Sequence, residues 1–165
     1  MKYLDFPNKR LRAEVIKDYL RNKKYDGVVC FSCGNATREL KNTGLNVIDV
    51  SPKGDFIPLH WFTPSEIKAM FPTYFDATSG HLGNDLMLLI AKRFKEFLGD
   101  IPQENYIPTG SGETLVCLKL AYPEKEFIAI YNLDSATEYN ENATLNNFVK
   151  IFSKKIIFSD LLSSQ

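Results

Sequence analysis

One local pattern occurs twice in this chain. A short apolar run ends in small polar residues and is followed at once by apolar residues at helical spacing, first over residues 27–41 and again over residues 106–122. A strand that leads through a tight turn into a helix, and then into another strand, is the building block of a parallel sheet. The pattern therefore predicts the α/β class, with three layers (α/β/α) around a mostly parallel sheet.

The remaining apolar spacing extends this alternation along the chain. Thr63-Pro64-Ser65-Glu66 combines an N-cap, a proline at the first helical position and a glutamate three residues after the cap, so a short helix begins there and ends before Pro72. Residues 75–83 are a segment rich in small residues that precedes the longest predicted helix. Residues 135–147 are predicted to form a loop leading to a short helix. Further helices are predicted over 11–20, 36–41, 84–98 and 115–122, and strands over 27–31, 45–50, 106–108, 127–131 and 155–158.

Length and composition limit the classes of protein. The 165 residues suggest a single domain, 1–165. Lys and Arg number 20 and so do Asp and Glu, which argues against nucleic-acid binding by general electrostatic attraction. Three cysteines are too few for a disulfide scaffold, and no signal-peptide pattern or membrane span is visible. These features predict a cytoplasmic protein without a membrane segment.

Both polar turns are candidate anion sites. Each directs free backbone N–H groups and the positive end of a helix dipole toward the carboxyl ends of the strands. The second turn, Thr109 to Thr114, is the better phosphate cradle, because Gly110 and Gly112 permit close backbone approach and Ser111 and Thr114 supply hydroxyl groups. Neither turn matches the P-loop of nucleoside-triphosphate-binding proteins.

The order of three segments carries a family resemblance. Asn8-Lys9-Arg10 opens a helix, the loop 32–37 follows a strand, and the glycine-serine loop 109–114 comes after a long helix. This succession resembles the pyridoxal-phosphate-dependent enzymes of fold type II, the tryptophan synthase β-subunit-like group, in the branch of D-cysteine desulfhydrase and aminocyclopropane-carboxylate deaminase. The resemblance covers residues 1–131, and residues 132–165 form a divergent C-terminal segment.

The resemblance implies a function and a set of site residues. The function is lyase, replacement or deamination chemistry on a small amino-group substrate, with pyridoxal phosphate as cofactor and no metal. Lys9 would form the Schiff base and move the α-proton, and Asn35 would contact the cofactor's phenolic oxygen. Cofactor phosphate would bind to Gly110, Ser111, Gly112 and Thr114, and substrate to Ser32, Cys33, Gly34, Thr37, Ser79 and His81.

The resemblance also has consequences for assembly and substrate size. Family members are considerably longer than this chain, and their usual partner for the pyridine nitrogen has no unique counterpart here, where Ser135, Thr137 and Ser159 are alternatives. A homo-oligomer, such as a homodimer, would complete the core. A shortened, open cleft permits an amino group carried on a larger molecule, with a modified nucleotide as one example.

Three alternatives stay open. Residues 28–34 and Asp49 resemble the first motifs of S-adenosylmethionine-dependent methyltransferases, although the loop holds one glycine where more are expected. Cys30 and Cys33 form a C-x-x-C pair, which without a second ligand pair fits a buried strand residue and a turn residue better than a zinc or redox site. A non-catalytic α/β module that binds a phosphorylated ligand or a protein partner is the third alternative.

Overall fold

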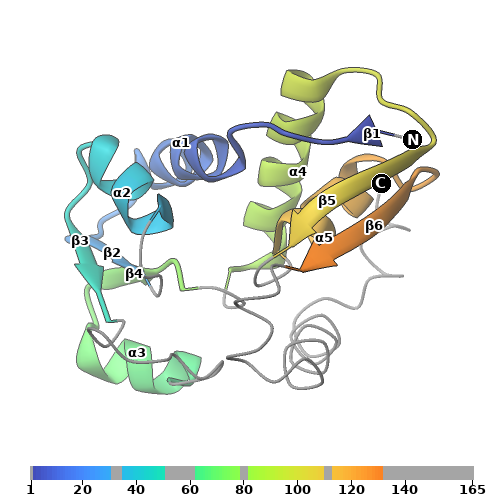
Figure 1. The fold of residues 1–165 in the computed structure, drawn as a ribbon. Coiled ribbons are helices and arrows are strands. Elements are labelled where there is room, and N and C mark those ends of the chain that lie inside the picture. The colour runs from blue at the N-terminus through green and yellow to red at the C-terminus, as the bar shows by residue number, and fades with distance from the viewer. Residues whose placement is uncertain (1, 31–34, 51–61, 79–81, 110–112, 132–165) are drawn as a thin grey trace. The chain divides into compact units, whose positions relative to one another are not determined.

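The computed structural model describes residues 2–30, 35–50, 62–78, 82–109 and 113–131. The fold within these ranges is α/β, with every strand pair parallel. The chain divides into two compact units: unit 1 comprises Met1–Asn8 and Gly83–Gln165, and unit 2 comprises Lys9–Leu82. Each unit has its own sheet and its own buried core (Figure 1). The division does not test the prediction of a single domain.

Unit 2 contains a three-stranded sheet with β2 (Gly27–Cys30) in the middle, flanked by β3 (Val47–Asp49) and β4 (Tyr74–Asp76). The chain leaves β2 through α2 (Asn35–Asn42) to β3, and then returns through α3 (Pro64–Met70) to the other side of β2. Since parallel crossovers are right-handed, two crossovers in opposite directions place α2 and α3 on opposite faces of the sheet. Figure 1 shows this arrangement, with α1 (Asn8–Leu20) on the same side as α2.

Burial along these elements explains why they form. All four residues of β2 are buried, as expected for the central strand of a sheet covered on both faces. Gly27 is required there because a Cβ at this position would lie 2.2 Å from the carbonyl oxygen of Asn46. Gly44, with φ +87°, follows the end of α2 in the left-handed conformation that glycine adopts readily. The core also includes apolar side chains of three helices: Leu11, Ile16, Leu40 and Ile67.

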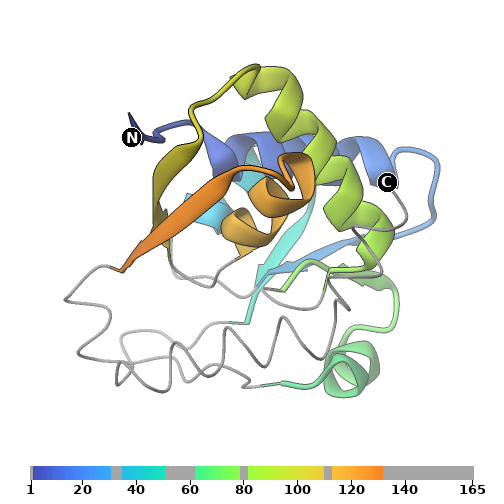
Figure 2. The same cartoon turned by 90° about the vertical axis from the view of Figure 1, so that its right-hand side faces the viewer.

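Unit 1 contains a second three-stranded sheet, in the order β1 (Lys2–Tyr3), β5 (Glu104–Thr109) and β6 (Glu126–Tyr131). Here the chain moves in one direction across the sheet, so the same right-handed rule places α4 (Asn84–Leu98) and α5 (Glu113–Ala121) on one face. Figure 2 shows both helices on the same side of the strands. The core between helices and sheet consists of Leu86, Ile90, Phe94, Ile107, Leu118 and Leu120.

Most predicted elements within the described residues are confirmed, and two differences are instructive. The strands are divided between two sheets. The sequence pattern does not predict β1 and β4, because two or three residues carry too little periodicity and are fixed as strands by pairing with β5 and β2. The predicted strand 155–158 and the predicted loop 135–147 lie outside the described residues. None of the described helices is long and apolar enough to span a bilayer.

Candidate functional site

The topology of unit 2 indicates where a ligand would bind. In open parallel sheets, ligands bind outside the carboxyl ends of the strands at the point where the strand order reverses. The order β3-β2-β4 places that point between β2 and β4. The strand ends there are Cys30 and Asp76, with Asp49 at the end of the neighbouring strand β3. The carboxyl edge of this sheet is the candidate site in unit 2.

Lys9, in the same unit, has a distinctive electrostatic environment. It lies in the first turn of α1 and is half-buried. Burial lowers the pKa of Lys9 below the usual 10.5, and the neighbouring Arg12 guanidinium lowers it further, while a smaller interaction with the Cys30 thiol acts in the opposite direction. Cys30 is the last residue of β2. The arrangement increases the fraction of Lys9 that is neutral, and only the neutral amine is nucleophilic.

The first turn of α2 carries the predicted Asn35 and Thr37. Asn35 is the first residue of the helix, where backbone N–H groups have no partner within the helix. The Thr37 hydroxyl is buried and has two acceptors within reach, Cys30 Sγ at 3.4 Å and Asp49 Oδ2 at 3.3 Å. Thr37 therefore links α2 to the ends of both β2 and β3. These hydrogen bonds do not test the substrate contact that the resemblance implies for Thr37. A single hydroxyl proton serves only one acceptor at a time.

Asp76 organises the chain immediately after β4. Its Oδ1 accepts hydrogen bonds from both the backbone N–H and the hydroxyl of Thr78, with an N–O distance of 3.0 Å for the former. Thr78 is buried. These hydrogen bonds form a turn directly after the end of β4. Among the described residues, no group of three or more His, Cys, Asp and Glu side chains is placed to hold a metal ion.

In unit 1, the N-terminus of α5 is the second candidate region. Asn8 Nδ2 donates to Thr114 Oγ1 at 2.7 Å, across 106 positions of the chain. Both residues of this hydrogen bond belong to unit 1, and Asn8 directly precedes Lys9 in the chain. Glu113 is buried in the same turn. Its carboxylate is favourable at a helix N-terminus, but it also adds negative charge beside the proposed phosphate loop.

The structure describes only some of the predicted site residues, and those lie in both units. Lys9, Asn35 and Thr37 lie in unit 2, and Thr114 lies in unit 1. The other predicted site residues lie outside the described residues: Ser32, Cys33, Gly34, Ser79, His81, Gly110, Ser111 and Gly112. The C-x-x-C pair is therefore described only at Cys30, which is buried in β2 as a strand residue.

The sequence pattern alone assigns no role to Asn8 or Asp76. The sequence shows that Asn8 begins the helix α1, but it does not indicate the hydrogen bond to Thr114, which lies 106 positions away. Asp76 is visible as Asp-x-Thr, the spacing of a side chain that bonds the backbone two residues later. Asp49, the predicted ribose acceptor of the methyltransferase alternative, is exposed and within hydrogen-bond distance of Thr37.

Comparison of the chain with protein-family models, curated proteins and solved structures finds no match.

Proposed function

We propose that this protein is a pyridoxal-phosphate-dependent enzyme that performs lyase, replacement or deamination chemistry on an amino-group substrate. The observation that carries the proposal is the hydrogen bond between Asn8 and Thr114. It links the residue before the proposed cofactor lysine to the end of the proposed phosphate loop, two motifs that are far apart in sequence and that the cofactor requires close together.

The described residues fit the two chemical ends of the cofactor. The aldehyde requires a neutral amine, and the lowered pKa of Lys9 favours that form. The phosphate requires backbone N–H groups and hydroxyl donors, which the first turn of α5 and Thr114 supply. When bound, pyridoxal phosphate supplies an electron sink for the carbanion formed at the substrate's α-carbon.

The chain's own residues would perform binding, orientation and proton transfer. Thr114 and the loop before it would bind the phosphate, and Asn35 at the start of α2 would orient the ring. The Lys9 Nζ atom would take the α-proton of the substrate and return it to the product. The free N–H groups at the start of α2 suit a substrate carboxylate, which would be bound in residues 32–37.

The test is a visible absorption spectrum of the purified protein after addition of pyridoxal phosphate, followed by borohydride reduction and peptide mapping. We expect a new visible band and a stable label on Lys9. Lys9→Ala should abolish both while leaving the circular dichroism spectrum unchanged. Lys24→Ala is the matched control, because Lys24 is an exposed lysine of the same unit.

Two results would refute the proposal. One is a band that persists in Lys9→Ala, and the other is a wild-type protein that shows no band and labels Lys9 no more than Lys24. A further variant, Asn8→Ala, tests the connection between the motifs. It should weaken cofactor binding by at most about tenfold, the equivalent of one hydrogen bond between uncharged groups.

A further inference from the structure

One face of the unit 1 sheet is left bare by the described helices. Tyr3 pairs with Tyr106 across β1 and β5, and Tyr106 pairs with Ile128 across β5 and β6. Paired residues of neighbouring strands lie on the same face, so these three side chains form one row. Tyr3 is 56% exposed and Ile128 is 41% exposed. Asn105 and Ile107, which alternate with Tyr106 along β5, are fully buried on the helix-covered face.

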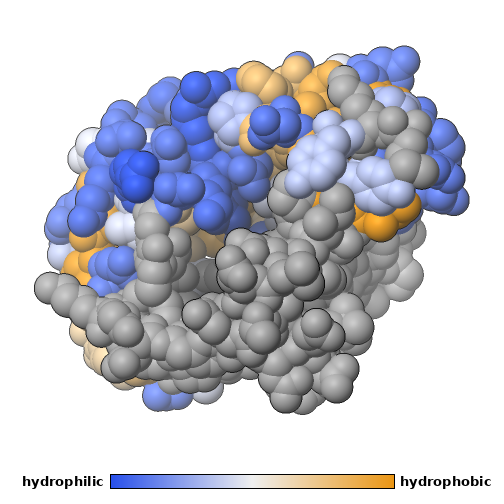
Figure 3. Space-filling view, viewed as in Figure 1, coloured by the Kyte–Doolittle hydropathy of each residue, from blue (hydrophilic) through white to orange (hydrophobic). Residues whose placement is uncertain are grey.

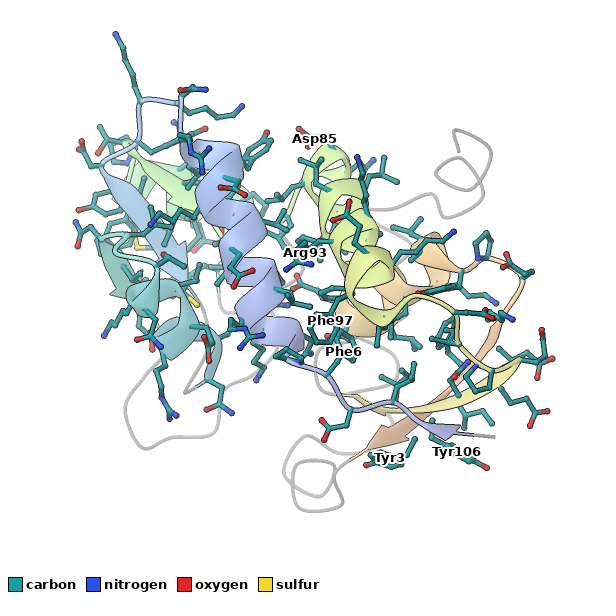
Figure 4. The ribbon with its side chains drawn as sticks, turned by 90° about the horizontal axis from the view of Figure 1, so that it is seen from above. Tyr3, Phe6, Asp85, Arg93, Phe97 and Tyr106 are labelled. Carbon is teal, nitrogen blue, oxygen red and sulfur yellow. The ribbon has the colours of Figure 1, made fainter. Side chains whose placement is uncertain are left out.

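Figures 3 and 4 also show the difference between the two faces of the unit 1 sheet. In Figure 4, Tyr3 and Tyr106 lie together on the side of the strands turned away from α4. The part of Figure 3 where these strands lie has pale and orange residues at the surface. Parallel sheets occur almost only with both faces covered, because each face carries apolar side chains. We therefore expect another element to pack on the face that carries Tyr3, Tyr106 and Ile128.

We propose that residues 145–152 form an amphipathic helix that packs on this row. Leu145, Phe148, Val149 and Phe152 have the spacing i, i+3, i+4, i+7, which places four apolar side chains on one helical face. Asn147 falls on the opposite face. A segment of this chain is a better occupant than a second copy, because it begins close to the row and is tethered there.

The length of the chain permits this packing. Described residues end at Tyr131, at the carboxyl end of β6. Residues 132–144 can span up to about 40 Å when extended, ample for the chain to turn onto the bare face. From there the helix would run antiparallel to the strands, as helices next to parallel strands do, toward the amino ends of β5 and β6.

Charge complementarity supports this direction. Glu104 and Glu126 are paired across β5 and β6 at the amino ends of these strands. By the alternation of side chains they lie on the same face as Tyr106 and Ile128. Lys154 and Lys155 follow the proposed helix after one intervening residue, Ser153. The antiparallel direction brings these lysines to the acidic end of the sheet, whereas the reverse direction would take them away from it.

Disulfide trapping in the full-length chain tests the proposal. The double variant Ile128→Cys with Phe148→Cys places one thiol on the row and one on the apolar helix face. The matched control, Ile128→Cys with Asn147→Cys, moves the second thiol by one residue to the opposite helix face. Mild oxidation should produce about tenfold more intramolecular disulfide in the first variant, because a disulfide needs Cβ atoms within about 4.5 Å.

Non-reducing electrophoresis and peptide mapping separate the outcomes, including any disulfides that involve native cysteines. An intramolecular disulfide between positions 128 and 148 that greatly exceeds the control supports the proposal. Equal trapping in both variants, or none in either, would overturn it. A disulfide-linked dimer through position 128 would overturn it too and would show that a second copy covers the face. If both variants unfold, hydrogen exchange of the wild-type chain decides. The amides of residues 149–152, which would donate within the proposed helix, should exchange slowly, and fast exchange there would overturn the proposal.

Discussion

At the residue scale, the environment of Lys9 has a definite consequence for pH dependence. Burial and Arg12 lower the pKa of Lys9 in the folded protein below 10.5. Between the lowered pKa and 10.5, the unfolded chain binds a proton at this position that the folded protein has released. The contribution of Lys9 to the free energy of unfolding therefore rises with pH through that window and is least favourable below it.

This environment predicts an unusually reactive amine. Lys9 should be modified by an amine-directed reagent at a lower pH in the folded protein than in the denatured chain, because the reagent attacks only the neutral amine. Mass spectrometry of labelled peptides across a pH series measures this. A Lys9 labelling profile that does not move on denaturation would contradict the predicted shift. The result is independent of whether pyridoxal phosphate binds.

At the element scale, α3 shows how local sequence determines a boundary. Thr63 Oγ1 accepts a hydrogen bond from the Glu66 backbone N–H at 3.2 Å, and Glu66 Oε1 accepts one from the Thr63 N–H at 3.1 Å. This capping box, with Pro64 at the first helical position, is predictable from four consecutive residues. Ile67 is the only buried residue of α3, so the cap supplies much of what defines the helix.

Removal of the cap should therefore loosen α3 locally. Thr63→Ala should cost about 1 kcal/mol in the free energy of opening this helix, the usual value for losing an N-cap side chain. Amide hydrogen exchange of Ile67 to Met70 would report it. Thr73→Ala is the control, since Thr73 is an exposed threonine just beyond the same helix. Equal changes in the two variants would show that the capping box does not stabilise α3.

At the scale of the whole molecule, the central feature is the order of the two units along the chain: the sequence of unit 2 interrupts the sequence of unit 1. The chain begins in unit 1 with β1, builds all of unit 2, and then returns to complete the unit 1 sheet. Each unit has a sheet and a set of fully buried side chains. A unit with its own core is expected to have its own free energy of unfolding. A core substitution in one unit should therefore destabilise mainly that unit.

Phe94 offers a direct test of that expectation. It is 1% exposed on α4 and packs edge to face against Phe6, with ring centroids 5.1 Å apart. Phe94→Ala should destabilise unit 1 by about 3–5 kcal/mol, through lost apolar burial and the resulting cavity. Phe97→Ala should cost no more than about 0.5 kcal/mol, because Phe97 on the same helix is 45% exposed (Figure 4).

Hydrogen exchange resolved by residue measures where the destabilisation falls. Amides of β5 and α5 should lose protection in Phe94→Ala, and those of β2 should lose less. An equal loss of protection in β2 would mean that the two units unfold as one cooperative body. That outcome would favour the single domain predicted from the length of the chain.

The sequence by itself determined the α/β class, most helix boundaries and the motifs of the candidate site. Those features depend on local periodicity, caps and glycines, as at Thr63 and Gly44, which act within a few residues. Tertiary structure decided the rest. Strand β4 exists because it pairs with β2, and Asn8 meets Thr114 because residues far apart in sequence are brought together by folding. The division of the strands into two sheets has the same origin, since pairing partners are chosen by burial and hydrogen bonding between distant segments.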